Sequence, residues 1–304
     1  MGRSGTTWVA QLINHDASHR LMFEPFFPAR VPEAQPFDYI QYLRPLSREP
    51  ARVEAARTIL AGRIRNPHVD QGNRGFLFRR RIIKEIRCNL MLRWLAALAP
   101  RMRIVLVVRH PFAVADSWLR LGWGAEALGR RTDFEIMMAQ KALLQDFAEL
   151  NDIAATIDPN EPLDRILFQW CAFHLVPLRQ FAADELFLVH YEKLIDPSSR
   201  EVDRLFAYLG RTIDPQRLAA ARKTPSLTAT LPPSNRGAAA PPGADNTARS
   251  AGEYARSGPA ADDSERSAGE HGDWRQRFSP AQLDRGRRMI EQCALPEWYP
   301  HLYL

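Results

Sequence analysis

Short apolar runs along the chain predict its strands. Residues 103–108 (RIVLVV) are almost continuously apolar, as expected of a strand buried on both faces of a parallel sheet. Residues 186–190 (LFLVH) and 80–86 (RRIIKEI) predict two further strands. Residues 20–26 (RLMFEPF) predict a short extended piece that reaches a proline. The chain therefore contains several strands that are well separated in sequence.

The segments between these runs have the apolar spacing and the end signals of helices. The expected helices cover 6–14, 35–44, 50–64, 88–98, a stretch that starts at Pro111, most of 133–183 except a break at 158–162, about 198–209 up to Gly210, and a stretch that starts at Ser279 and Pro280. Strands and helices alternate, so the sequence predicts an α/β fold of three layers, in which helices cover both faces of a central parallel sheet. A length of 304 residues suits one domain over 1–304.

The stretch 224–272 departs from this pattern. Proline, alanine, glycine, serine and charged residues dominate it, and the pentapeptide RSAGE occurs in it twice. So little apolar surface does not offset the entropy that ordering a chain costs. We expect a flexible loop or lid over the functional site here.

Composition narrows the class of protein. The net charge is +6, and only four of the 41 basic residues are lysines. Basic and aromatic residues do not alternate as in a nucleic-acid-binding tract, so no nucleic-acid partner is expected. The three cysteines lack the spacing of a disulfide framework or a zinc site, which favours the reducing cytoplasm. No apolar run approaches the length of a membrane span.

The segment from Gly2 to Trp8 (GRSGTTW) has the pattern of a phosphate-binding loop. Its glycines allow a tight turn, and the following helix directs backbone N–H groups and its positive end at an anion. A kinase loop would carry a lysine for the terminal phosphates, and a nucleotide triphosphatase would offer a metal-binding aspartate after an apolar strand. Here Arg109 and His110 follow that strand. The pattern favours an enzyme that uses an already activated anionic donor and needs no metal. A P-loop kinase is the alternative.

The loop resembles that of the PAPS-dependent sulfotransferase family, closest in style to bacterial and carbohydrate-type members. PAPS is 3′-phosphoadenosine 5′-phosphosulfate, and its product is adenosine 3′,5′-bisphosphate (PAP). The resemblance covers most of 2–210 and returns at 269–298. It implies a P-loop nucleotide-binding-like fold in which Arg3, Ser4, Gly5, Thr6 and Thr7 grip the 5′-phosphosulfate and Trp8 lies near the adenine. Relatives place a central strand directly before the loop, and we expect this N-terminal strand to be missing here.

A second motif, VVRHPFAVADSW at 107–118, supports the same resemblance. Arg109 follows a buried strand, and Ser117 lies about two turns into the next helix, so both side chains can reach one group. In the family, an arginine and a serine at this spacing hold the 3′-phosphate. The segment 269–275 (GEHGDWR) resembles another 3′-phosphate element, which implies a role for Trp274 and for Arg275 or Arg266.

A general base is needed because a neutral hydroxyl is a poor nucleophile. Glu24, in the segment MFEPF, resembles a glutamate that carbohydrate-type members place beside the transferred group. The alternative is that Glu24 pairs with an arginine and only shapes the pocket. His15, His19 and Glu85 are further candidates. Cytosolic members carry a histidine where Ile86 stands here, so their base is absent.

Two other segments complete the expected site. The resemblance leaves Lys84 as a contact to the sulfuryl or bridging oxygen, or as a buried structural lysine. His190 to Leu194 (HYEKL) resembles a family element whose tyrosine and glutamate pack at the sheet edge. The sequence thus predicts an enzyme that uses PAPS and no metal to sulfate a small-molecule, carbohydrate or lipid acceptor. A truncated protein that binds PAPS or PAP without catalysis is the alternative.

Overall fold

The computed structural model describes residues 1–73, 75, 77–123, 131–224 and 274–293. The predicted lid at 224–272 lies outside the described residues except for Thr224. The segment 269–273 and Arg266 also lie outside them, whereas Trp274 and Arg275 are described.

Four strands form where the apolar runs predicted them. They are β1 (Arg20–Phe23), β2 (Arg81–Lys84), β3 (Ile104–Val108) and β4 (Leu186–His190). Strand β1 pairs in parallel with β2, and β3 pairs in parallel with β4. The prediction of parallel strands is therefore confirmed. Across the described residues these strands make two separate two-stranded sheets, whereas the sequence predicted one central sheet.

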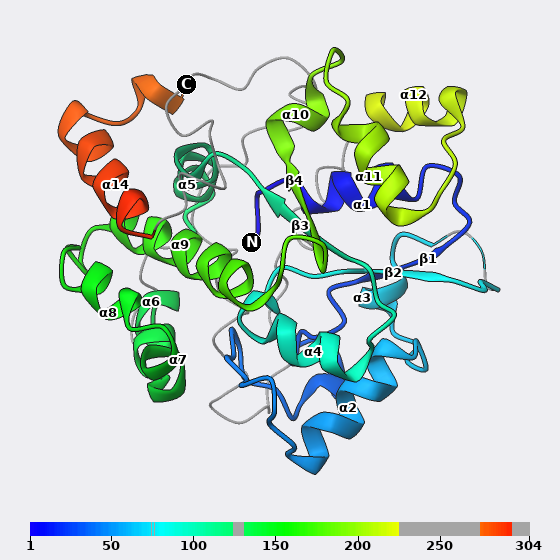
Figure 1. Cartoon of the computed structure of the whole chain (residues 1–304), viewed down its shortest axis with the longest axis horizontal. Coiled ribbons are helices and arrows are strands. Elements are labelled where there is room, and N and C mark those ends of the chain that lie inside the picture. The colour runs from blue at the N-terminus through cyan, green and yellow to red at the C-terminus, as the bar shows by residue number, and fades with distance from the viewer. Residues whose placement is uncertain (74, 76, 124–130, 225–273, 294–304) are drawn as a thin grey trace.

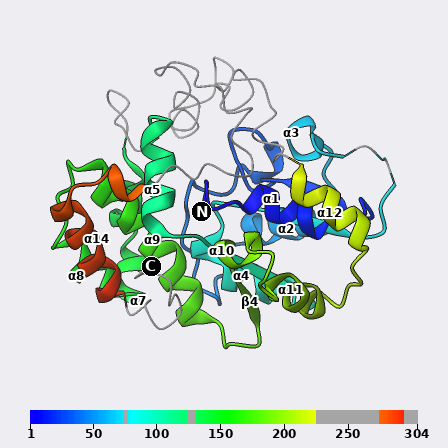
Figure 2. The ribbon, with the colours of Figure 1, turned by 90° about the horizontal axis from the view of Figure 1, so that it is seen from above.

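Alternate side chains of β3 and β4 pack into two different hydrophobic clusters, one on each face of the strand pair. Val107 and Val189 pack with α1 (Thr6–Ile13) and α11 (Glu201–Leu209). Val108 and Leu188 pack with α5 (Pro111–Arg120) and α9 (Pro162–Gln180). Successive strand side chains point to opposite faces, so both faces of this pair are covered. Figures 1 and 2 agree, with α5 and α9 on one side of the strands and α1 and α11 on the other.

Other helices surround these strands. They are α2 (Pro50–Leu60), α3 (Pro67–Asp70), α4 (Leu92–Leu98), α6 (Asp133–Met138), α7 (Lys141–Asp146), α8 (Glu149–Ala154), α10 (Tyr191–Ile195), α12 (Pro215–Lys223) and α14 (Pro280–Gln292), with the 3₁₀ turns η1 (Pro32–Ala34), η2 (Asn89–Met91) and η6 (Trp274–Gln276). The short helices α3, α10 and α12 were not predicted from the sequence.

Helix ends follow the predicted signals. Ser279 caps α14, because its hydroxyl accepts from the backbone N–H of Gln282 while the Gln282 side chain accepts from the Ser279 backbone. Gly210 ends α11 in the left-handed conformation, with φ of 59°. Helix α9 is buried along most of its length, as expected for a helix at the centre of a core.

The helix predicted at 35–44 is wrong. This stretch consists of short turns up to residue 40 and of irregular backbone at 41–44. The side chain of Gln140 satisfies the backbone instead: its oxygen accepts from Tyr42 N at 2.7 Å, and its amide donates to Ile40 O at 2.9 Å. Hydrogen bonds from Gln140, which lies between α6 and α7, thus replace the local ones that the apolar pattern suggested.

Candidate functional site

The predicted phosphate loop, from Gly2 to Trp8, runs into α1 and has an unusual backbone. Arg3 and Gly5 have φ of 64° and 80°, in the left-handed region that favours glycine. Gly5 is the residue before the first turn of α1. A Cβ at Gly5 would collide with the ring of Tyr191. Gly5 is therefore required both by its conformation and by the close approach of Tyr191.

The side chains of this loop face inward. Ser4 is fully buried, and within the described part of the chain its hydroxyl has no hydrogen-bond partner. Thr7 is buried and Thr6 is half-buried in the first turn of α1. Trp8 packs edge-on against Tyr191, with 5.9 Å between ring centroids. A buried hydroxyl without a partner at the start of a helix suits an anionic ligand, because such a group costs free energy unless it is bonded.

The two predicted anion-binding motifs face each other. The Nε of Arg3 donates to Ser117 Oγ at 2.9 Å, and Arg109 NH1 donates to the carbonyl oxygen of Arg3, also at 2.9 Å. The guanidinium of Arg109 also lies 4.9 Å from the ring centroid of Tyr191. Residues separated by more than 100 positions are thus in direct contact. Their roles in binding PAPS remain a prediction.

Glu24 lies in a buried cluster with two cations. One carboxylate oxygen accepts from Lys84 Nζ and the other from Arg87 NH1. Glu24 and Lys84 are buried, and Arg87 is half-buried. Lys84 lies 4.3 Å from the ring centroid of Phe23, and Glu24 has a left-handed φ of 45°. A left-handed non-glycine residue is strained unless its surroundings hold it, and such strain concentrates at functional sites.

The cations determine the charge state of Glu24. Burial alone would raise the pKa of Glu24, but the charges and hydrogen bonds of Lys84 and Arg87 outweigh it and lower the pKa to about 2. Burial and the nearby charge of Glu24 raise the pKa of Glu85, whose Oε1 accepts from Phe26 N at 2.7 Å. Burial lowers the pKa of His68 to about 4. Glu24 is therefore an anion at neutral pH.

The cluster and the loop are neighbours. A Cβ at Gly2 would lie 3.5 Å from Ile86 Cδ1, and Ile86 stands between Glu85 and Arg87. Glu24 follows the carboxyl end of β1, and Arg109 follows that of β3. Lys84 is the last residue of β2, and Glu85, Ile86 and Arg87 come directly after it. The carboxyl edge of parallel strands is where open α/β folds place their ligands.

Trp274 and Arg275, the described residues of the predicted element at 269–275, lie in different surroundings. Trp274 stacks on His110 and Phe112, at centroid distances of 4.2 and 5.5 Å, so it lies beside the turn that carries Arg109. Arg275 is exposed, with its guanidinium 4.7 Å from the centroid of the Trp274 ring. The structure therefore brings Trp274 close to the second motif and leaves Arg275 on its outer side.

The candidate bases His15 and His19 lie away from the cluster. His15 follows the far end of α1, where its Nε2 accepts from Asp214 N at 3.2 Å. His19 precedes β1, at the end of the strand opposite Glu24, and its Nδ1 contacts Ser18 Oγ at 2.7 Å. Among the bases considered, the structure places Glu24 and Glu85 together near the loop.

Two residues of the site were missed or underrated. Arg87 was not predicted, although it follows Lys84 by three positions at the end of the same strand. Tyr191 was predicted to pack structurally, and the structure adds that its ring supports Gly5 and lies below Arg109. Glu192 braces the same region, because its Oε1 accepts from His110 N at 2.8 Å.

Neither a metal-binding group nor a membrane-spanning helix is found among the described residues. Among the described residues, no three or more His, Cys, Asp or Glu side chains gather in a group that could hold a metal ion. None of the helices in those ranges is both long and apolar enough to cross a membrane. All three cysteines are buried free thiols.

Comparison with known proteins gives one family. The model described as "Sulfotransferase domain" matches residues 1–297, which is nearly the whole chain. No curated protein and no solved structure gives a significant match.

Proposed function

Because the chain belongs to the sulfotransferase family, we propose that it transfers a sulfuryl group from PAPS to a hydroxyl or amine of a small-molecule, carbohydrate or lipid acceptor. The observation that supports PAPS as the donor is the contact between the loop and the second motif. Arg3 contacts Ser117, and Arg109 contacts Arg3. The residues assigned to the 5′-phosphosulfate and those assigned to the 3′-phosphate therefore lie next to each other. A P-loop nucleotide-binding-like fold is part of this proposal.

The loop fits the proposed donor. Ser4 offers a buried hydroxyl that the described chain does not satisfy, and Gly5 leaves room that a Cβ would fill. We assign the 5′-phosphosulfate to the loop and α1, the adenine to Trp8 and the 3′-phosphate to the second motif. The loop residues are Arg3, Ser4, Gly5, Thr6 and Thr7, and the second motif supplies Arg109 and Ser117, with Trp274 and Arg275 beside it. When bound, PAPS would supply an already activated sulfuryl group, so no metal is needed to create one.

Glu24 is the proposed general base. It would accept the proton of the acceptor hydroxyl as that oxygen forms its bond to sulfur, while the bond from sulfur to the bridging oxygen breaks. Arg3, Thr6 and Thr7 would stabilise the negative charge that develops on the leaving bisphosphate, and fixed positive groups of this kind supply much of the rate enhancement in transfer reactions.

Lys84 resolves a difficulty in this assignment. A carboxylate whose pKa is about 2 is a weak base while both cations touch it. We propose that Lys84 turns from Glu24 to a sulfuryl oxygen when the donor binds. Loss of the cation nearest to Glu24 would raise the pKa of Glu24, and the same movement would place positive charge where the reaction needs it.

The variant Glu24→Gln tests this proposal. It should bind PAP as tightly as the wild type in isothermal titration calorimetry, because Glu24 is not assigned to the nucleotide. Its rate of sulfuryl transfer should fall by about 10²–10⁴-fold, the usual contribution of a general base. Acceptors are found by mass spectrometry of an extract incubated with PAPS, as products heavier by one sulfuryl group.

The exposed Glu54 on α2 provides a matched control, and Glu54→Gln should change neither quantity. Full transfer activity in Glu24→Gln, with PAP binding intact, would remove Glu24 from the role of base.

A further inference from the structure

A pocket beside β4 is separate from the candidate site. Its volume is about 360 Å³, and it lies between the end of α9, the strand β4 and the helices α10 and α11. None of the loop residues, the Glu24 cluster, Arg109 or Ser117 lines it. The pocket is therefore not explained by the proposed reaction.

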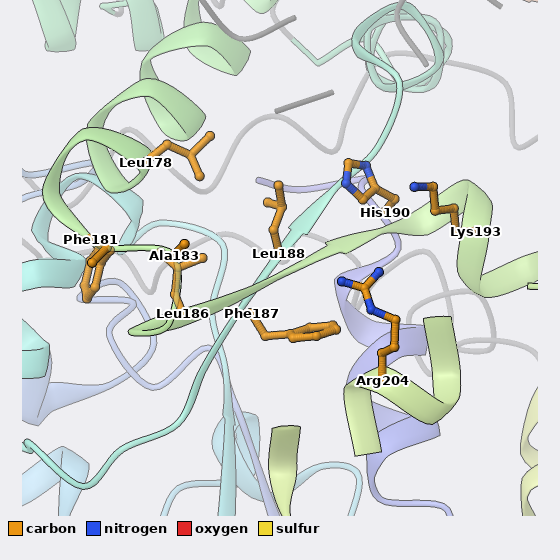
Figure 3. A pocket seen from close by; sticks show the side chains of 10 residues that line it. Leu178, Phe181, Ala183, Leu186, Phe187, Leu188, His190, Lys193 and Arg204 are labelled. Carbon is orange, nitrogen blue, oxygen red and sulfur yellow. The ribbon is translucent and has the colours of Figure 1, made fainter. Parts of the chain in front are cut away.

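One end of the pocket is apolar. Leu178, from the end of α9, and Phe181, which follows that helix, line it together with Leu186 and Leu188 of β4 (Figure 3). Phe181 and Leu186 are buried side chains of one apolar cluster, against which Leu178 and Leu188 pack. A short hydrocarbon chain or ring would find apolar contacts here, and each buried methylene group stabilises binding.

The other end is basic. Figure 3 shows the side-chain nitrogens of His190, Lys193 and Arg204 at one end of the pocket, although these residues come from three different elements. Arg204 NH1 pairs with Glu201 Oε2 at 2.9 Å, and the Arg204 side chain remains 64% exposed. No acidic side chain in the described ranges forms an ion pair with Lys193. Within the described residues, the positive charge of Lys193 is therefore not neutralised by an ion pair.

We propose that this pocket binds a small organic anion made of a single anionic head group, such as a carboxylate, on a short apolar tail. The head group would lie against Lys193 and Arg204, and the tail would lie among Leu178, Leu186 and Leu188. A charged hydrogen bond is stronger than a neutral one, so the head group would decide affinity and the tail would add to it.

The test uses octanoate as the probe and the full chain as the protein. Isothermal titration calorimetry should show saturable binding of octanoate, at least about tenfold tighter than that of octan-1-ol or acetate, because a charged hydrogen bond and the apolar tail both contribute. Affinity across hexanoate, octanoate and decanoate should rise by about fourfold per added methylene while the pocket has room. Binding of octan-1-ol as tight as that of octanoate, or no saturable binding of octanoate, would overturn the proposal.

Variants locate the site. Lys193→Gln should weaken octanoate binding by about tenfold or more, and Lys193→Arg should retain it, because the positive charge is kept. Lys223→Gln changes an exposed lysine at the end of α12 and should leave octanoate binding unchanged. Unchanged octanoate affinity in Lys193→Gln would exclude this pocket.

Binding of PAP, measured on the same variants, separates this inference from the proposed reaction. Each variant should bind PAP as the wild type does, which also shows that it is folded. Octanoate should still bind when PAP is saturating. Competition between the two would place octanoate in the donor site and overturn the proposal.

Discussion

At the scale of single residues, the contacts of Glu24 link stability to pH. In the folded protein Lys84 and Arg87 hold the pKa of Glu24 at about 2, well below its ordinary value of 4.5. A depressed carboxyl pKa stabilises the folded state fully above the unfolded pKa, and this contribution is lost as the pH falls through the folded value. Glu24 should therefore stabilise the protein above about pH 4.5 and lose that effect towards pH 2.

We predict a pH-dependent difference between the wild type and Glu24→Gln. The free energy of unfolding, from urea titrations, should be lower for the variant by a constant amount above pH 5, because Lys84 and Arg87 lose a buried partner. The difference should shrink as the pH approaches 2, where Glu24 also becomes neutral. Glu54→Gln is the control and should differ little from the wild type throughout. A difference that stays the same from pH 7 to pH 2 would contradict the ion pairing.

A second prediction at this scale concerns Arg109. The variant Arg109→Ala should weaken PAP binding in calorimetry by about 10–100-fold, the effect of losing one charged hydrogen bond of roughly 1.5–3 kcal/mol. Arg103 is exposed just before the opposite end of the same strand, so Arg103→Ala is a matched control that should retain PAP affinity. Equal PAP affinity in Arg109→Ala and the wild type would refute the assigned 3′-phosphate site.

At the scale of elements, α14 packs closely enough to be sensitive to one methyl group. A Cβ at Gly286 would lie 2.5 Å from Phe112 Cζ and 2.7 Å from Leu167 Cδ1. Arg285, next to it, donates from Nε to both oxygens of the buried Asp164, at 2.9 and 3.0 Å. These contacts fix α14 against α9 and α5, beside the turn that leads from Arg109.

We predict that Gly286→Ala destabilises the protein. An added methyl group in a filled core costs about 1–3 kcal/mol, which exceeds the gain of up to about 1 kcal/mol from the better helix propensity of alanine. Thermal unfolding should show a lower Tm for Gly286→Ala. Asp284→Ala, at an exposed position of the same helix, should stay within about 0.5 kcal/mol of the wild type. A Tm for Gly286→Ala equal to or above that of the wild type would show that α14 is packed more loosely than described.

At the scale of the whole molecule, the fold brings the two predicted anion-binding motifs into contact, through Arg3 with Ser117 and Arg109 with Arg3. A ligand that binds only the folded state stabilises it by about 2.7 kcal/mol at a concentration 100 times its Kd. PAP should therefore raise the Tm by several degrees in a thermal-shift assay, with or without Mg²⁺. ATP with Mg²⁺ should have a smaller effect, because the loop has no lysine for the terminal phosphates. A larger shift with ATP and Mg²⁺ than with PAP would favour a P-loop kinase.

Features that depend on neighbouring residues were predicted from the sequence better than features that depend on contacts between distant segments. The helix ends at Ser279 and Gly210 depend on neighbouring residues and were predicted correctly. The stretch 35–44 was predicted wrongly, because Gln140, about 100 residues away, supplies its hydrogen bonds. Arg87 was missed for a similar reason: its partner Glu24 follows a different strand, and no spacing rule joins them.

The sequence by itself determined the parallel strands, most helices and the glycine turn that enters α1, since apolar periodicity, caps and glycine conformation act within a few residues. It also indicated the family, through the residues of the loop and the second motif. Only the tertiary structure decided which charges meet. The contacts of Arg3 with Ser117, of Glu24 with Lys84 and Arg87, and of Tyr191 with Gly5 join distant segments, and such contacts depend on how the strands and helices pack.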